Sequence, residues 1–229
     1  MRVAVLNDVH GNLPALEAVL AELQSHEVEG IVCGGDVVAG PFPRDCLARL
    51  VDAGAAFVRG NADRESPRAP PGTWEWISVQ LDPLALEFLS TLPQTVSLDG
   101  VLYCHGSPRD DDEILTRVSP DERFRAALAG VEERLVVGGH THVQFERTVD
   151  GIRFVNVGSV GIPYEGKPGA FWALIDGHDV DLRRTPYAVD AAAALIRTST
   201  YPGAEQIAGW LLEPEDPDET SAYFESIAT

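Results

Sequence analysis

The chain has 229 residues, of which 45% are hydrophobic and 23% are charged. This length fits one ordinary α/β domain, and the composition excludes a disordered chain because a large core can form. Thirty-six acidic residues against 17 basic ones give a net charge of −19, which disfavours binding to nucleic acid polymers or anionic membranes. A small anionic substrate is compatible with this charge, because bound divalent cations would reverse the local field.

The three cysteines lack CxxC spacing and give no disulfide framework, so we expect Cys33 and Cys104 to be buried thiols. No run of about 18 apolar residues predicts a membrane span. The first residues are interpreted as a strand and not as a signal peptide, because Asn7 and Asp8 interrupt a short apolar stretch. We therefore expect a cytoplasmic protein without a membrane partner.

The beginning of the chain alternates between strand and helix patterns. Strands are predicted at residues 3–6, 30–33 and 55–58, and helices at about 13–25 and 44–53. Asn12 is the expected N-cap of the first helix, with Pro14 in its first turn. This order predicts an α/β fold with parallel strands, which bind ligands beyond their carboxyl ends. Asp8, Asp36 and Asn61 all follow predicted strands, and this suggests a site.

After a proline-rich loop at 67–72, helices containing Trp74 and Trp76 indicate a small helical insertion over about 64–92. Further strands, several of them antiparallel, are predicted at residues 96–99, 101–104, 135–137, 144–149, 152–155, 170–175 and 180–184, and a helix at 189–198. From Glu205 onward there are seven acids and no Lys or Arg. We expect one domain over 1–204 and an acidic, mobile segment over 205–229.

Five short motifs contain the residue types that bind metal ions, including four of the six histidines. They are Asp8-Val9-His10, Gly35-Asp36, Gly60-Asn61-Ala62-Asp63, His105-Gly106 and Gly139-His140-Thr141-His142. Each motif is weak alone, but together they supply seven oxygen and nitrogen ligands beside strand ends or glycine turns. Without thiolates, such a set suits Mn²⁺, Fe²⁺/Fe³⁺, Co²⁺, Ni²⁺ or Zn²⁺ better than Ca²⁺ or Mg²⁺.

In this order the motifs resemble the calcineurin-like metallophosphoesterase family, from residue 1 to about residue 184. The runs at 35–38, 105–110 and 156–161 are similar to its small bacterial and archaeal phosphodiesterase-like branch. The resemblance implies an α/β fold, a four-layer αββα sandwich of two mixed β-sheets flanked by helices. It also implies that the site lies at the edges of the sheets.

The resemblance further implies two bound metal ions, preferably Mn²⁺, each held by its own set of ligands. Asp8, His10 and His142 would bind the first ion, Asn61, His105 and His140 the second, and Asp36 would bridge both. A metal-bridging hydroxide would attack phosphorus while the ions neutralise the phosphate oxygens. The implied activity is that of a two-metal phosphoesterase, and foremost a phosphodiesterase acting on small phosphoesters.

The motif around Asn61 departs from the family pattern. Many members carry histidine directly after this asparagine, where it is thought to protonate the leaving group, but this chain has Ala62. We expect Asp63 to accept a hydrogen bond that orients a neighbouring group in the catalytic motif. General acid catalysis contributes about 10²–10⁴-fold. Alkyl phosphomonoesters should therefore be poor substrates. The rate of hydrolysis of aryl esters, activated diesters and anhydrides should be reduced less, because their leaving groups depend less on protonation.

Two arginines are candidates for binding the substrate phosphate, since guanidinium binds phosphate through two hydrogen bonds. Arg109 lies four residues after His105, and Arg64 follows Asp63. Either could instead be an ion-pair partner, because the acids at 110–112 lie beside Arg109.

Alternatives from other functional classes stay open. A nucleotide pyrophosphatase or a protein phosphatase would use the same metal site, although residues 37–40 do not resemble the extended protein phosphatase motif. A non-catalytic, metal-bound interaction scaffold usually lacks one or more ligands, whereas all seven are present here. A homo-oligomer is compatible with the sequence, and no nucleic acid polymer is expected as a partner.

Overall fold

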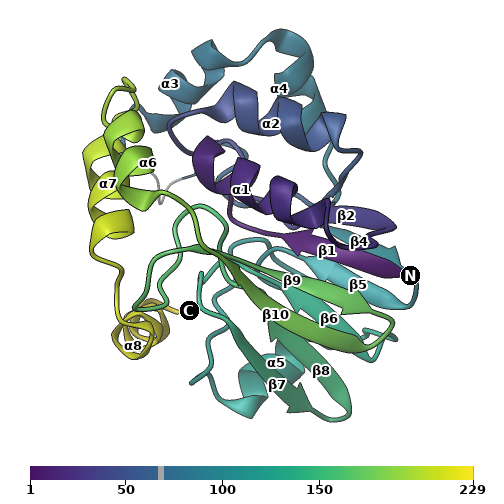
Figure 1. Ribbon diagram of the computed structural model, residues 1–229. Helices are drawn as coiled ribbons and strands as arrows, with labels where there is room; N and C mark the ends of the chain where they lie inside the picture. Colours follow the sequence, from purple (N-terminus) through teal and green to yellow (C-terminus); the bar gives the residue numbers. More distant parts are fainter. Residues whose placement is uncertain (67–69, 229) are drawn as a thin grey trace.

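The computed structural model of the protein describes residues 1–66 and 70–228. Within these ranges, ten strands form two mixed five-stranded sheets, flanked by eight helices (Figure 1). The first sheet has the order β10 (Asp179–Thr185), β9 (Ala170–Asp176), β1 (Arg2–Leu6), β2 (Gly30–Cys33) and β3 (Ala56–Phe57). The second sheet has the order β4 (Thr95–Leu98), β5 (Val101–Cys104), β6 (Leu135–Gly138), β8 (Ile152–Asn156) and β7 (Phe145–Val149).

The alternation of side chains along β1 explains why the sheets form the two inner layers. Val3 and Val5 are buried between the sheets, whereas Ala4 and Leu6 belong to the core beneath the helices. The outer layer on the first sheet consists of α1 (Leu13–Leu23), α2 (Pro43–Asp52), α3 (Thr73–Gln80) and α4 (Pro83–Ser90). The outer layer on the second sheet is α5 (Asp121–Ala127), which contributes Phe124 to that core. The expected four-layer αββα sandwich is confirmed.

Strand pairing agrees with the predicted order of elements. β1, β2 and β3 are parallel, while β4 with β5, β7 with β8, and β9 with β10 are antiparallel. Asn12 caps α1, because its side chain accepts a hydrogen bond from the Ala15 amide at 3.2 Å. No helix within the described ranges has the length and apolar character needed to cross a membrane.

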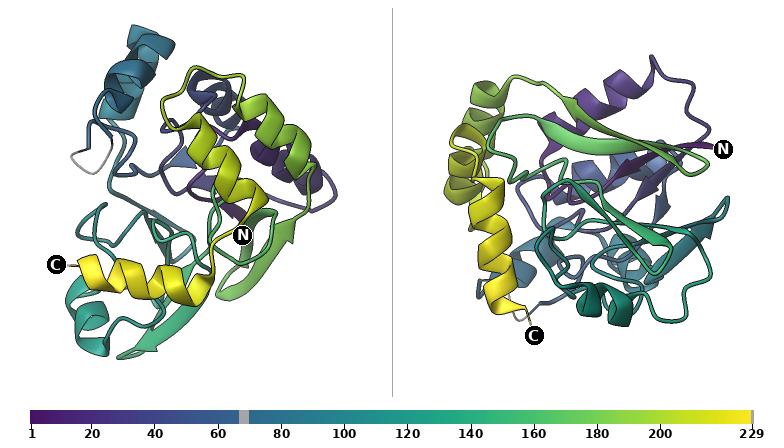
Figure 2. Two further views of the ribbon diagram at one scale, coloured as in Figure 1. Left: turned by 90° about the vertical axis from the view of Figure 1, so that its left-hand side faces the viewer. Right: turned by 90° about the horizontal axis from the view of Figure 1, so that it is seen from below.

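The carboxyl-terminal part, expected as an acidic, mobile segment over residues 205–229, contains two helices. After α6 (Val189–Ile196), it forms α7 (Ala204–Leu212) and α8 (Pro217–Ile227), which lie along one side of the molecule (Figure 2). The reason for α7 is its apolar spacing, which buries Ile207, Ala208 and Leu211 in a core shared with α6. Asp216 stabilises the beginning of α8 as its N-cap, because its carboxylate accepts hydrogen bonds from two amides of the first turn.

Candidate metal centre

The five predicted motifs meet at the carboxyl ends of the inner strands. Asp8 follows β1, Asp36 follows β2 and Asn61 follows β3 in the first sheet. His105 follows β5, and the His140 motif follows β6, in the second sheet. Because neighbouring parallel strands end at the same edge, residues that are far apart in the sequence, such as Asp8 and His142, come into contact there.

Unusual backbone conformations gather at this place. Asp8, His10, Asp36, His140 and His142 all have positive φ angles, between 46° and 69°. Such conformations cost free energy in residues other than glycine and are concentrated at functional sites. In the described part of the chain, the two other such residues are aspartates in hairpin turns before glycine.

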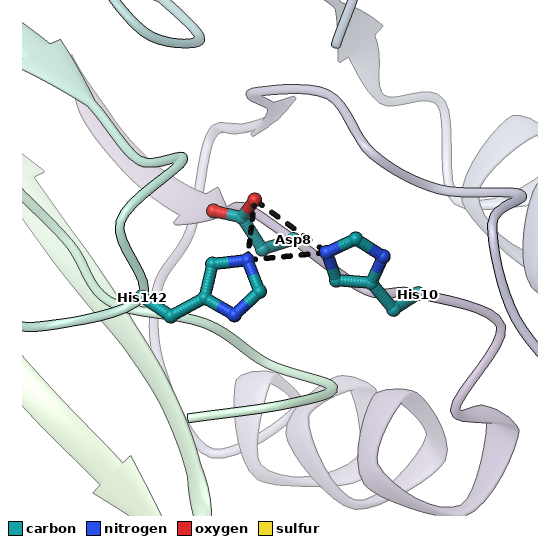
Figure 3. Close-up of side chains that lie close together, drawn as sticks. All are labelled: Asp8, His10 and His142. Carbon is teal, nitrogen blue, oxygen red and sulfur yellow. Dashed lines mark hydrogen bonds and ion pairs between the residues drawn. The ribbon is translucent and has the colours of Figure 1, made fainter. Parts of the chain in front are cut away.

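Asp8, His10 and His142 form the first group of potential ligands (Figure 3). Their ligand atoms lie within 4.8 Å of one another, and all three residues are buried. The His142 Nε2 atom is 3.2 Å from Asp8 Oδ1 and 3.1 Å from His10 Nε2. The predicted first ion would lie among these three atoms.

The orientation of the two imidazole rings supports a cation between them. Nδ1 of His10 faces the Ala39 carbonyl at 3.2 Å, and Nδ1 of His142 faces the Ile162 carbonyl at 2.6 Å. Because a carbonyl only accepts hydrogen bonds, each Nδ1 carries a proton, and each Nε2 is the atom that would present a lone pair to a metal ion. Two lone pairs 3.1 Å apart repel each other unless a positive charge lies between them.

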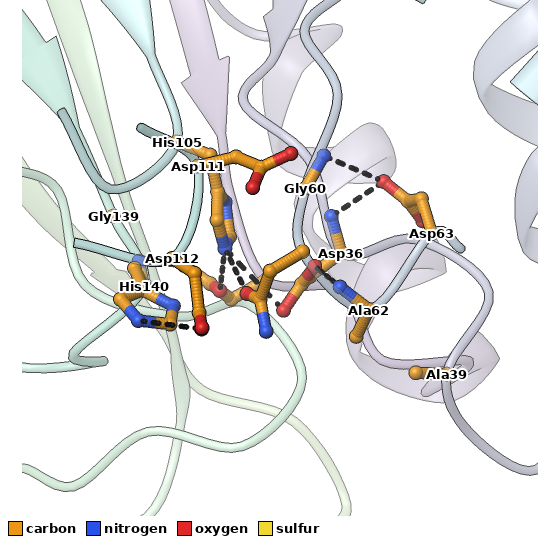
Figure 4. Close-up of polar contacts among 12 residues, drawn as sticks. Asp36, Ala39, Gly60, Ala62, Asp63, His105, Asp111, Asp112, Gly139 and His140 are labelled. Carbon is orange, nitrogen blue, oxygen red and sulfur yellow. Dashed lines mark hydrogen bonds and ion pairs between the residues drawn. The ribbon is translucent and has the colours of Figure 1, made fainter. Parts of the chain in front are cut away.

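Asp36, His105 and His140 form the second group, again with ligand atoms within 4.8 Å of one another (Figure 4). The Asn61 side-chain oxygen is 3.0 Å from His105 Nε2. His105 Nδ1 donates its hydrogen to the Gly34 carbonyl at 2.8 Å, so Nε2 is the atom that would present a lone pair to a metal ion in the neutral ring. His140 Nε2 is buried and has no hydrogen-bond partner among the described residues. These atoms fit a second cation.

Asp36 lies between the two groups. Its Oδ2 atom is 3.6 Å from His10 Nε2 in the first group and 3.4 Å from His105 Nε2 in the second. Burial opposes ionisation of Asp36, but the surrounding histidines, His105 foremost, hold its pKa far below the usual range. The location and the negative charge of Asp36 both fit a ligand shared by two ions.

The buried surroundings of the histidines shift their pKa values in opposite directions. Burial disfavours a charged His105, but Asp36 and Asp8 raise its pKa to about 10. Burial and the nearby His105 lower the pKa of His140 to about 4. Buried carboxylates thus recruit a positive charge from the protein itself, and a bound cation would supply the same charge.

Asp63 fixes the loop that carries Asp36. Its carboxylate accepts hydrogen bonds from the amides of Asp36 at 2.8 Å, Val37 at 2.7 Å and Gly60 at 3.1 Å. Burial and the Asp36 carboxylate raise the pKa of Asp63 to about 6. Through these hydrogen bonds, Asp63 holds the loop that carries Asp36 in place. Ala62 contributes its amide, which donates to Asp36 Oδ1 at 2.7 Å.

Glycine is required where the motifs touch. A Cβ atom on Gly139 would lie 2.4 Å from Asp8 Oδ2, and one on Gly60 would lie 2.1 Å from Asp36 Oδ1. Both contacts are far below van der Waals distance, so these glycines allow backbone to approach the carboxylates directly.

Several supporting residues were not predicted as part of the site. Ser159 donates its hydroxyl hydrogen to the Asp8 carbonyl at 2.8 Å, and Asn156 donates to the Gly139 carbonyl at 2.5 Å. Asp112 Oδ1 lies 3.8 Å from His140 Nε2. The glycine-rich run 156–161 thus supports the ligand loops. Only its proximity in space reveals this, since the sequence separates it from Asp8 by about 150 positions.

The two candidate phosphate-binding arginines are both in ion pairs. Arg64 contacts Asp111 at 2.6 Å, and the same carboxylate also accepts from Arg59 at 2.7 Å. Arg109 pairs with Glu113 and also donates to the Ala126 carbonyl. The ion-pair alternative therefore describes the observed side-chain contacts, although the partner of Arg109 is Glu113 and not one of the acids at 110–112.

A cavity of about 310 Å³ opens beside the ligand groups. His10, Asp36, Asn61, His140 and His142 lie on one side of it, together with Ala62. Other parts of the lining come from the insertion, from α7 and α8, and from loops that carry Tyr164 and Tyr201, so that aromatic side chains lie at positions 164, 201, 210 and 224. Positions 201, 210 and 224 were not predicted as part of the cavity, although the apolar periodicity of α7 was a signal for a packed helix there.

Comparisons with known proteins agree with this geometry. The sequence model of the calcineurin-like phosphoesterase superfamily domain matches residues 1–178. The chain is 26% identical over 231 residues to the uncharacterized protein MJ0912 of Methanocaldococcus jannaschii, covering 87% of this chain and 93% of that protein. It is 27% identical over 188 residues to phosphodiesterase YfcE of Escherichia coli K12, and the match covers 76% of this chain and 87% of YfcE. The structure of a metallophosphoesterase from Sphaerobacter thermophilus is similar, with a TM-score of 0.79 and 28% sequence identity. The match covers 93% of this chain and 98% of that chain.

Proposed function

The chain belongs to the calcineurin-like phosphoesterase superfamily, and we propose that it is a two-metal phosphodiesterase for small phosphoesters. The observation that carries the proposal is the pair of facing Nε2 lone pairs on His10 and His142, 3.1 Å apart beside the buried Asp8 carboxylate. Such an arrangement needs a positive charge between the nitrogen atoms, and a metal ion bound by both of them and by Asp8 would supply that charge.

The proposed ligands follow the two groups of the structure. Asp8, His10 and His142 would hold one ion, Asn61, His105 and His140 the other, and Asp36 both. Bound there, two ions would neutralise the charge of a phosphate and lower the pKa of an attacking water. Oxygen and nitrogen ligands favour Mn²⁺ or a similar transition metal. Asp63 keeps the Asp36 loop in position, because its carboxylate binds the amides of that loop.

The cavity supports a small substrate. Its volume of about 310 Å³ lies at the lower end of the range for small-molecule pockets. The net charge of −19 disfavours a nucleic acid polymer. The relative YfcE is named a phosphodiesterase, which favours diesters as the substrate class.

The alternatives receive less support from the contacts. A nucleotide pyrophosphatase would need cations for a second phosphate, but Arg64 and Arg109 are already paired with Asp111 and Glu113. A metal-bound scaffold without activity has no need of a cavity that opens onto the ligand atoms.

Metal analysis combined with hydrolysis tests the proposal. Protein stripped with a chelator and reloaded with Mn²⁺ should bind about two ions per chain and hydrolyse bis(p-nitrophenyl) phosphate. In Asp36→Ala, ion binding should fall and hydrolysis should drop by at least about 100-fold, since the shared ligand is lost. The control Asp52→Ala changes an exposed carboxylate on α2 and should keep both properties. Folded protein that binds no ion, or that binds ions without hydrolysing any ester, would contradict the proposal.

A further inference from the structure

We propose that α7 and α8, together with Tyr164 and Tyr201, form a subsite for an aromatic group without charged substituents, so that the preferred substrates are aryl phosphoesters. The inference rests on the proposed phosphodiesterase function and adds the substrate class. Helices α6, α7 and α8 lie beyond residue 178, where the match to the family ends. A binding role for these helices is therefore specific to this chain and others with a similar C-terminal part.

Aromatic rings extend outward from the metal centre in an unbroken series. The Tyr164 ring stacks on His142 with centroids 5.0 Å apart and an angle of 14° between the planes. Trp210 of α7 contacts Tyr164 edge-on at 5.9 Å, and Phe224 of α8 lies 6.3 Å from the same ring. All three side chains line the cavity, with Tyr201 in the same wall. Such rings bind a planar aromatic group by stacking and edge-to-face contacts.

Among the described residues, the remaining wall carries no formal charge. Apart from Asp36 and the three histidines of the candidate metal centre, the described residues that line the cavity are neutral, and they include Ser66, Thr73 and Gln206. The neutral character of these residues contrasts with the chain as a whole, which has 36 acidic and 17 basic residues. A second phosphate, a sugar phosphate or a charged peptide would find no complementary charge among these described wall residues. The part of the substrate beyond the phosphoester should therefore be uncharged.

The absence of a proton donor at Ala62 favours the same class. Ala62 lines the cavity that contains the aromatic wall. During hydrolysis, the water oxygen bonds to phosphorus and the bond between phosphorus and the aryl oxygen breaks. The electron pair leaves on the aryl oxygen, one water proton stays on the phosphate product and the other goes to solvent. A phenol ionises near pH 10, so its oxygen departs as an anion far more readily than an alkyl alcohol.

Binding of two non-hydrolysable phosphonates tests the subsite separately from catalysis. Titration calorimetry of the Mn²⁺-loaded protein should show phenylphosphonate binding roughly tenfold more tightly than methylphosphonate. Phe224→Ala and Trp210→Ala should each reduce this ratio several-fold. Tyr223→Ala is the matched control, because Tyr223 is adjacent on α8, is 61% exposed and does not line this cavity. The control should keep the ratio of the unmodified protein.

The outcomes separate the subsite from the metal centre. Equal affinity for the two phosphonates, or a preference that Phe224→Ala and Trp210→Ala leave intact, would overturn the aromatic subsite while the metal centre stands. Failure of both phosphonates to bind in the presence of Mn²⁺ would overturn the proposed function and the subsite with it. If Trp210→Ala does not fold, Trp210→Leu retains apolar volume without the ring, and it should show the same loss of preference.

Discussion

At the scale of single residues, we expect Ala62 to limit which leaving groups the site can release. Its amide donates to Asp36 Oδ1 at 2.7 Å, and its side chain faces the substrate cavity. A methyl group there can neither donate a proton nor accept one. The same position therefore supports the metal ligand through its backbone while leaving the departing oxygen without help from its side chain.

Replacing Ala62 with histidine should restore that help. We expect Ala62→His to raise kcat for an alkyl phosphomonoester by about 100-fold, the lower limit for general acid catalysis, and to change kcat for a p-nitrophenyl ester little. Steady-state rates of the Mn²⁺-loaded proteins on both substrates provide the measurement. Ala62→Gln is the control, because it fills similar space but cannot donate a proton at neutral pH. Equal rates for the two variants on the alkyl ester would show that protonation there is not limiting.

The residue types of the metal centre could be predicted from the sequence, but their supports could not. Aspartate and histidine after strand ends indicated ligands, since parallel strands bring their carboxyl ends together. The hydrogen bonds from Ser159 to the Asp8 carbonyl and from Asn156 to the Gly139 carbonyl depend on how distant segments pack. No local pattern encodes such contacts. The ion pair of Arg109 with Glu113 lies in an irregular segment, where the i,i+4 spacing of a helix does not apply, so spacing could not predict it.

At the scale of elements, helix α8 shows that a cluster of acidic residues does not by itself predict the absence of a helix. The many acids around residues 213–219 suggested a solvated segment, yet α8 begins at Pro217. Two of its carboxylates have specific partners: Asp218 pairs with Arg117, and Glu225 accepts hydrogen bonds from the segment that precedes α5. By contrast, the strands were predictable to within a few residues, because alternation and buried apolar runs are local properties.

Glu225 should anchor α8 to the second sheet. Its carboxylate accepts from Ser119 at 2.7 Å and from Thr116 at 3.2 Å, and it pairs with Arg123 at 2.7 Å. Hydrogen bonds to charged groups contribute about 1.5–3 kcal/mol each, less where solvent reaches them. Glu225→Ala should lower the free energy of unfolding by about 1–2 kcal/mol and speed amide exchange in 217–227. Glu213→Ala, an exposed carboxylate before α8, is the control. Unchanged exchange in α8 would mean that its apolar contacts hold it alone.

At the scale of the whole molecule, the surplus of acid weakens the folded state. Thirty-six acids face 17 bases, so even complete pairing would leave 19 carboxylates without a basic partner. Several of the arginines pair on the surface, where each ion pair contributes little. Repulsion among the remaining acids falls when salt screens them. The buried carboxylates of the metal centre are different, because a mobile salt cloud does not reach them.

Salt and Mn²⁺ should therefore stabilise the protein by separate routes. Raising NaCl from about 0.01 M to about 0.15 M shortens the Debye length from about 30 Å to about 8 Å, and Tm should rise. At constant salt, Mn²⁺ at about 100 times its Kd should add about 2.7 kcal/mol, or roughly 5–10 °C in Tm for a domain of this size. Asp36→Ala should keep the salt effect and lose most of the Mn²⁺ effect, both measured by thermal unfolding. An increase with Mn²⁺ that persists in Asp36→Ala would mean that the ion acts through surface carboxylates, because only the buried centre depends on Asp36.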